Sequence, residues 1–294
     1  MAEADLVPSR PLQVLDALPG AGAALLRAAV TAVRRPRGTP QIKPAGVCVR
    51  AVVAEPEQLA AYRRVCGLRS AATLPLTYPH VMGETLQLWL MSRPEFPLPM
   101  LGLVHLANRF EQIEPIAAQR RIDLAVWFGN SEVTHRGLEF EVVTEASGSD
   151  GRRLWIGVST YLYRMRSARP AATHKPAPVP KLDRREPVDA TADVGRRYAR
   201  VSGDFNPIHL YAATARLFGF RRAIAHGMWS AARCLGALEE AHGLSAQRME
   251  LRFRSPLLLP AMCELRSRCD NDSVEFVLAG HHDRLYLEGT LGRL

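Results

Sequence analysis

The most informative part of this 294-residue sequence contains YARVSGDFNPIH at residues 198–209 and GFRRAIAHGM at residues 219–228. In the first string, Asn206 is a favourable helix N-cap and Pro207 suits the first helical position, so His209 is expected in a first helical turn. Gly203 permits a bend just before Asp204. The carboxylate of Asp204 and the imidazole of His209 can therefore face one small volume and deprotonate a water molecule held there.

The second string leads into an apolar helix predicted over residues 226–242. Unpaired N–H groups and the positive end of the helix dipole lie at such a start, and Gly227 lets a substrate oxygen approach the backbone. An acid–base pair beside such a site suits the addition of water to, or its removal from, an enoyl group conjugated to a thioester. Considered alone, Asp204 and Asn206 would instead be capping residues and His209 a buried, hydrogen-bonded side chain.

The two halves of the chain share short matching segments. Residues 62–68 read YRRVCGL and residues 198–204 read YARVSGD, with four identical positions of seven. Further along, HVM at residues 80–82 corresponds to HGM at residues 226–228. These matches indicate an internal duplication.

The differences between the copies place the candidate site in the second half. The matched glycine and the matched histidine are 13 positions apart in the first copy and 23 in the second, so the second carries a ten-residue insertion. The insertion contains Asn206-Pro207-Ile208-His209, and Leu68 stands in the first copy where the second has Asp204. The chemistry-bearing residues are therefore absent from the first copy.

The remaining sequence is typical of antiparallel sheets and one helix per half. Runs of β-branched and aromatic residues predict strands at 102–107, 121–128, 138–144, 153–163, 249–254, 263–268, 273–279 and 285–291. Turns are expected at Gly129-Asn130 and at 149–151, and the first helix at 80–92. The proline-rich segment 168–187 is predicted to be an irregular linker. The predicted domains are an extension at 1–45, a first repeat without the catalytic motif at 46–167, the linker, and a second repeat with the motif at 188–294.

Composition narrows the class of protein. The chain has 38 basic and 29 acidic residues and a net charge of +9, which favours phosphate-bearing ligands. The basic residues are dispersed and no nucleic-acid-binding module is recognisable, so nucleic acid is not an expected partner. Five scattered cysteines and the absence of a signal-type N-terminus favour a cytoplasmic protein. The apolar stretch 21–33 is interrupted by Arg27 and too short to span a bilayer, so a surface helix is expected there and no stable membrane insertion.

The string at 198–228 resembles the hydratase-2 motif of the MaoC-like dehydratases, also called (R)-specific enoyl-CoA hydratases, and residues 249–260 resemble the next segment of that family. The rest of the chain is similar to the family's two-repeat members. The resemblance implies an α+β double hotdog fold, in which each repeat wraps an antiparallel β-sheet around a long central α-helix and one repeat is active.

The resemblance also implies a hydro-lyase that interconverts a trans-2-enoyl-CoA and its (R)-3-hydroxyacyl-CoA. It makes Asp204 and His209 the catalytic pair that holds the water, Asn206 a positioning residue, and Gly227 the backbone N–H donor to the thioester carbonyl. Ser202 and His226 also lie within the motif. For these two residues the interpretation is a loop or cap hydrogen bond.

The expected ligand is the thioester of coenzyme A or of an acyl carrier protein. Four arginines are candidates for the phosphates of coenzyme A: Arg221, Arg222, Arg252 and Arg254. The chain has no glycine-rich nucleotide loop, so neither ATP nor NAD is expected, and no other cofactor. His281-His282 are interpreted as exposed turn residues, and no metal site is expected.

Two other functions are also compatible with the sequence. In a hotdog acyl-CoA thioesterase, Asp204 would direct water at the carbonyl, and release of free CoA from a saturated acyl-CoA would favour that reading. A non-catalytic acyl-thioester binding subunit would keep the fold without turnover. Because two repeats in one chain can reproduce a hotdog dimer internally, a monomeric pseudo-dimer and a homodimer are both compatible with the sequence.

Overall fold

The computed structural model describes residues 8, 11–20, 22, 31, 36, 38–165 and 182–294. The surface helix expected at 21–33 and most of the expected linker lie outside the described residues. None of the described helices is both long and apolar enough to cross a membrane.

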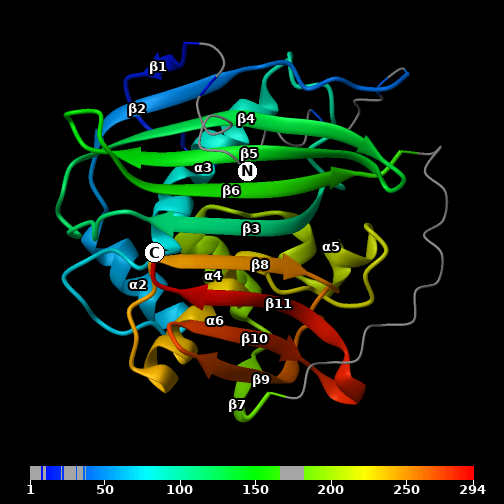
Figure 1. Ribbon diagram of the computed structural model, residues 1–294. Helices are drawn as coiled ribbons and strands as arrows, with labels where there is room; N and C mark the ends of the chain where they lie inside the picture. The colour runs from blue at the N-terminus through cyan, green and yellow to red at the C-terminus, as the bar shows by residue number, and fades with distance from the viewer. Residues whose placement is uncertain are drawn as a thin grey trace.

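A single sheet of eleven strands runs through both halves of the described chain (Figure 1). Its strand order is β1-β2-β4-β5-β6-β3-β8-β11-β10-β9-β7. The strands have the following bounds: β1 Gln13–Leu15, β2 Gly46–Val52, β3 Val104–Gln112, β4 Ile122–Thr134, β5 Gly137–Ser147, β6 Arg153–Tyr163, β7 Arg184–Ala190, β8 Arg248–Phe253, β9 Ala261–Asp270, β10 Ser273–Ala279 and β11 Leu285–Gly292.

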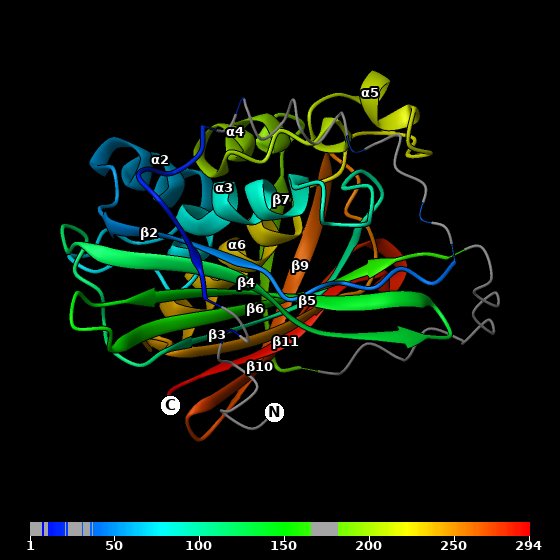
Figure 2. The ribbon, with the colours of Figure 1, turned by 90° about the horizontal axis from the view of Figure 1, so that it is seen from above.

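The helices gather on one side of this sheet, as Figure 2 shows. They have the following bounds: α2 Pro56–Cys66, α3 Tyr78–Ser92, α4 Val194–Ser202, α5 Ala212–Arg216 and α6 Gly227–His242, with 3-10 turns η2 Pro207–His209 and η3 His281–Asp283. The long helices α3 and α6 are apolar on most of their surface because each is enclosed by its half of the sheet. The predicted arrangement of a sheet wrapped around a long helix in each half is confirmed.

The two halves join through β3 and β8, which pair antiparallel with residues 107–111 opposite residues 248–252. One hydrophobic cluster extends from the first half into the second. Trp229 of α6 donates its indole N–H to the carbonyl of Val65 in α2, at 3.1 Å. The halves therefore share one core and hold each other in place.

The matched segments at 62–68 and 198–204 form the ends of helices α2 and α4. Both helices stop at a glycine with left-handed φ, 67° at Gly67 and 85° at Gly203, which is the usual geometry of a glycine-terminated helix. The rings of Tyr62 and Tyr198 lie 6.1 Å apart, so the duplicated helices meet each other. The sequence analysis found the repeat but did not assign these helices.

Three local expectations were wrong. Gly129-Asn130 do not form a turn but lie inside β4, where the pairing with β5 shifts between Phe128 and Ser131 and forms a bulge. The last predicted linker residues, 184–187, belong to β7. Pro187 is tolerated there because β7 ends the strand order and has an unpaired edge. The strand expected at 102–107 starts at Val104 and continues to Gln112.

Candidate active site

The loop after α4 brings Asp204 into a defined position. Gly203 turns the chain with its left-handed φ, and the amide of Asp204 then donates to the hydroxyl oxygen of Ser202 at 3.2 Å. The Asp204 carboxylate accepts a hydrogen bond from the amide of Asn206, with Oδ1 at 3.0 Å. Ser202 therefore makes the loop hydrogen bond that the sequence predicted for it.

The predicted cap at Asn206 is present. Its side-chain oxygen accepts from the amide of Ile208 at 3.4 Å, and η2 begins at Pro207, which places His209 in the first turn. The Nδ1 atom of His209 lies 2.9 Å from the carbonyl oxygen of Ile224. Because a carbonyl oxygen only accepts, Nδ1 carries the proton, and Nε2 is left with a free lone pair in the neutral ring.

Asp204 and His209 face each other as expected. Nε2 of His209 lies 3.9 Å from Oδ2 of Asp204, which is too long for a direct hydrogen bond. In the neutral tautomer both atoms are acceptors. A water molecule near them can donate one hydrogen bond to each, and a substrate hydroxyl can donate to one of them, so the geometry suits binding of one water molecule or one substrate hydroxyl.

His226 belongs to this site: it makes the loop hydrogen bond that was predicted for it, and it also contacts both Asp204 and His209, which was not predicted. Its Nε2 lies 3.0 Å from the backbone oxygen of Asp204 and 3.6 Å from Oδ2 of the same residue. Its ring stacks on that of His209, with centroids 3.7 Å apart. Both rings are buried. His226 thus packs against both members of the pair, and the repeated HVM and HGM strings were the one signal that could have drawn attention to it.

Burial sets the protonation of the three groups. Burial lowers the pKa of His209, although the Asp204 carboxylate and the Ile224 carbonyl oppose it. Burial likewise lowers the pKa of His226 to about 3, with His209 adding to the effect. For Asp204, burial raises the pKa, but His226, His209 and the Asn206 amide outweigh it and the pKa stays below its usual value. At neutral pH the site therefore holds an ionised carboxylate and two neutral imidazoles.

Gly227 opens α6 directly beside this cluster, with His226 as the N-cap. As the first helical residue it has an N–H without an intrahelical acceptor. A Cβ at Gly227 would lie 2.7 Å from the ring of Phe253, so the missing side chain is needed for packing as well as for access to the backbone. The predicted anion-stabilising donor is thus placed at the helix start next to the acid–base pair.

The same three side chains could offer ligand atoms to a metal ion. One atom each of Asp204, His209 and His226 lies within 4.8 Å of the others, and the described residues contain no other such group. Nε2 of His226, however, must carry a proton to donate to the carbonyl of Asp204. Metal binding through that atom would require this hydrogen bond to be given up.

The first repeat contributes polar groups near this cluster, which the sequence analysis did not predict. Glu84 of α3 is buried, which raises its pKa; His80 opposes this effect and the Asp204 charge adds to it. His105 of β3 stacks on Tyr161 at 4.6 Å and lies 4.8 Å from Phe253. The phenylalanine that packs on Gly227 therefore contacts the first repeat.

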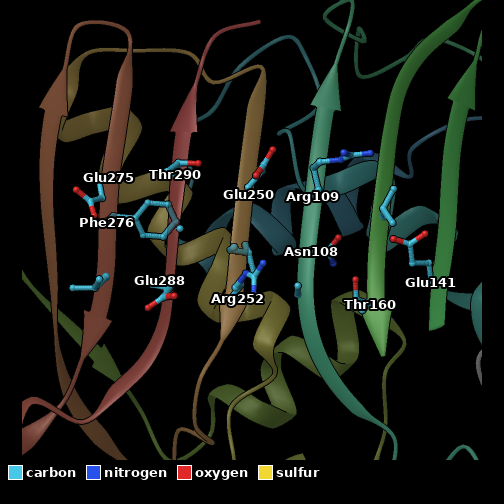
Figure 3. A pocket seen from close by; sticks show the side chains of 15 residues that line it. Asn108, Arg109, Glu141, Thr160, Glu250, Arg252, Glu275, Phe276, Glu288 and Thr290 are labelled. Atoms are coloured by element: carbon cyan, nitrogen blue, oxygen red, sulfur yellow. The ribbon is translucent and has the colours of Figure 1, made fainter. Parts of the chain in front are cut away.

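The four candidate arginines lie on different sides of the molecule. Arg221 and Arg222 are exposed on the loop that precedes α6, and Arg222 donates to the carbonyl of Pro260 at 3.2 Å. Figure 3 shows Arg252 on the sheet surface that faces away from the helices, near Glu250 and Glu288. Arg254 forms an ion pair with Glu288. The structure does not bring Arg252 or Arg254 to the cluster, and only Arg221 and Arg222 remain candidates for phosphate contact.

His281 and His282 form the exposed turn η3, as predicted.

Comparisons with known proteins found a matching family model and several similar chains. Residues 174–277 match the family model for the MaoC like domain. A relative from Mycobacterium tuberculosis, 3-hydroxyacyl-thioester dehydratase X, is 36% identical over 247 residues, which cover 82% of this chain and 86% of that protein. The crystal structure of HtdX from the same organism matches with a TM-score of 0.72 and 31% identity, over 84% of this chain and 99% of that chain. A MaoC-like dehydratase from Phytophthora capsici shares the fold, with a TM-score of 0.63 and 17% identity over 84% and 94% of the two chains.

Proposed function

Because the chain belongs to the MaoC-like dehydratase family, we propose that it is a 3-hydroxyacyl-thioester dehydratase that interconverts a trans-2-enoyl thioester and its (R)-3-hydroxyacyl thioester. The observation that carries this proposal is the separation of 3.9 Å between Nε2 of His209 and Oδ2 of Asp204, two acceptors aimed at one place. A reaction that adds or removes water requires such a place.

In the hydration direction, water donates one hydrogen bond to Asp204 and one to His209. His209 takes the proton as the water oxygen forms its bond to C3, because its lowered pKa keeps it neutral and able to accept. Electron density moves through C2 onto the thioester oxygen, where the N–H of Gly227 stabilises the negative charge. The pair then returns the proton to C2. Dehydration follows the same steps in reverse.

The remaining residues of the motif position this pair. Asn206 contacts both sides of the pair. Its backbone N–H donates to the carboxylate of Asp204, and its side-chain oxygen caps the turn that carries His209. His226 donates to the carbonyl of Asp204 and stacks on His209, which restrains both in one geometry. We assign His226 a positioning role because its Nε2 already has a backbone acceptor.

The test follows the loss of the conjugated enoyl-thioester absorbance with trans-2-octenoyl-CoA, and separately the release of free thiol. Wild-type protein is expected to remove the absorbance without releasing thiol, and Asp204→Asn to lose turnover by about 10² to 10⁴ fold. Release of thiol from octanoyl-CoA would instead indicate a thioesterase. If Asp204→Asn turned over like the wild type, the proposed role of the pair would be wrong.

A further inference from the structure

The segment from residue 211 to residue 222 lies between η2, which carries His209, and α6, which begins at Gly227. Its surface has an unusual composition. We define the α5 patch by the six exposed residues of this segment that have large side chains: Tyr211, Arg216, Leu217, Phe218, Arg221 and Arg222. Figure 2 shows α5 at one edge of the helix layer. Arg216 and Arg221 also line an open surface hollow with Gly219 and Phe220.

Three large apolar side chains of the patch are exposed to solvent. The exposed fraction is 81% for Leu217, 57% for Tyr211 and 39% for Phe218. Among the described residues few large apolar side chains are exposed at all, and these three lie within eight positions of one another. Clustering of this kind is typical of a contact surface, because isolated exposed apolar residues are normal but grouped ones are not.

The charge of the patch is entirely positive. Residues 205–238 contain no aspartate or glutamate. Within the part of the chain that the structure describes, Arg216, Arg221 and Arg222 form no ion pair, whereas some exposed arginines elsewhere do, such as Arg254 with Glu288 and Arg268 with Glu275. These arginines thus remain available to a negatively charged partner.

The α5 patch is tied to the catalytic residues at both of its ends. The hydroxyl of Thr214 in α5 donates to the carbonyl of Pro207 at 2.6 Å, two residues before His209 in η2. At the other end, the carbonyl of Ile224 accepts from His209. Gly227 follows three residues later. The segment that carries the patch is therefore bonded to the turn that holds His209 and leads directly to Gly227.

We propose that the α5 patch docks an acidic acyl carrier protein, which presents the enoyl or 3-hydroxyacyl group as a phosphopantetheine thioester. The inference rests on the proposed function and names the carrier of its substrate. The phosphates of coenzyme A can pair with the arginines, but its adenine ring is the one planar group that could pack against the three apolar side chains. A protein surface with an apolar centre and an acidic rim complements all six residues of the patch.

The experiment compares one acyl group on two carriers. Values of kcat/KM are measured with trans-2-octenoyl-CoA and with trans-2-octenoyl groups on an acidic acyl carrier protein, for the wild type and for Leu217→Glu. Leu217 is almost fully exposed, so the substitution leaves the core untouched. We expect the ratio of carrier-protein to CoA activity to fall at least tenfold in Leu217→Glu. Raising sodium chloride from 50 to 500 mM is expected to lower the carrier-protein activity of the wild type more than its CoA activity.

Leu294→Glu is the matched control, because it makes the same substitution at another exposed leucine. It introduces one negative charge at the C-terminus, which Figure 1 shows on the opposite side of the molecule from α5. This variant is expected to keep the wild-type ratio, because net charge changes but the patch does not.

Each other outcome overturns the proposal in a distinguishable way. An equal loss of kcat/KM with both carriers would mean that Leu217 contacts the thioester substrate and not the carrier protein. Turnover of the CoA thioester alone would refute the docking proposal and leave the dehydratase standing, while turnover of neither would refute the proposed function. Sedimentation of the wild type, but not of Leu217→Glu, with vesicles of phosphatidylglycerol, together with an unchanged ratio, would assign the patch to a lipid surface.

Discussion

The starts of helices α3 and α6 occupy equivalent places in the two repeats but have different surroundings. In α3 the imidazole of His80 is engaged by its own helix, with Nδ1 3.2 Å from Gln87 and Nε2 3.4 Å from Glu84. In α6 the equivalent His226 has no such partners on its helix. Its Nε2 instead meets Asp204 in the loop after α4.

This difference shows that the two repeats share a fold, while the candidate site is built only in the second repeat. The change from Leu68 to Asp204 brings an ionised carboxylate to the N-terminus of α6, and the insertion brings a second imidazole, that of His209. The first repeat has only the short connection before Thr77, whose hydroxyl lies 2.8 Å from the Tyr62 hydroxyl. Helices α3 and α6 occupy equivalent positions in the two repeats, but the residues that can hold water, Asp204 and His209, lie between α4 and α5.

The largest expected contrast is between His209→Ala and His80→Ala. Removal of the proposed base should lower kcat by about 10² to 10⁴ fold. His80→Ala should leave kcat within about threefold but destabilise the protein by about 1–3 kcal/mol, because buried Glu84 and Gln87 lose a partner. Enzyme assays and urea unfolding of both variants check this. A loss of kcat with His80→Ala comparable to that with His209→Ala would mean that the first repeat takes part in the reaction.

A second contrast uses the residue that follows each helix-start histidine, Gly227 in α6 and Val81 in α3. In Gly227→Ala the new methyl group must displace the Phe253 ring, so we expect a loss of about 1–3 kcal/mol in stability. Movement of the backbone donor should also lower kcat/KM by at least about tenfold. Val81→Ala, a core truncation, should cost about 1–2 kcal/mol without lowering kcat/KM. Equal kinetic effects in the two variants would argue against the donor role of Gly227.

The pH dependence of stability provides a third comparison, between His226 in the second repeat and His105 in the first. Burial lowers the folded-state pKa of both to about 3, whereas an unfolded histidine titrates near about 6.5. As the pH falls below about 6.5 the unfolded chain binds these protons first. The stabilisation is therefore complete above that pH and is lost progressively toward pH 3.

Urea unfolding at pH 7, 6 and 5 measures this effect. His226→Gln and His105→Gln should each flatten the slope of unfolding free energy against pH, by at most about 1.4 kcal/mol per pH unit. His226→Gln should also lower kcat severalfold, because the restraint on Asp204 and His209 is weakened. A slope that matches the wild type in both variants would show that neither ring stays neutral in the folded protein.

The sequence predicted the regular parts of this molecule and the proximity of Asp204 and His209, because these depend on local signals. Strands β6 and β10 and helix α6 have strong hydrophobic patterns, and the Asn206 cap lies next to the residues it organises. Strand β7 was mistaken for linker since its proline and charged residues fit an edge strand equally well. Arg252 lies on the face of β8 that points away from the helices, and alternation along a strand cannot tell which face helices cover.

The role of His226 was missed for a related reason. Its partner Asp204 lies 22 positions earlier in the chain, and the contact exists because α4, η2 and α6 pack together. No local pattern encodes that packing. The match between HVM and HGM indicated only that both histidines occupy a helix start.

The smallest contrast tests the inserted turn through Asn206→Ala and compares it with Thr77→Ala at the N-cap of α3 in the first repeat. Asn206 caps η2 through a hydrogen bond of 3.4 Å, so loss of the cap should cost about 1 kcal/mol or less. Because the turn carries His209, kcat should fall severalfold, and Asn206→Ser should recover most of it by restoring a capping oxygen. Thr77→Ala removes a buried hydrogen bond to Tyr62 at a similar cost in stability. Because both partners of that bond lie in the first repeat, the kcat of Thr77→Ala should match that of the wild type. A fall in kcat equal to that of Asn206→Ala would mean that the starts of α3 and η2 are coupled through the shared core.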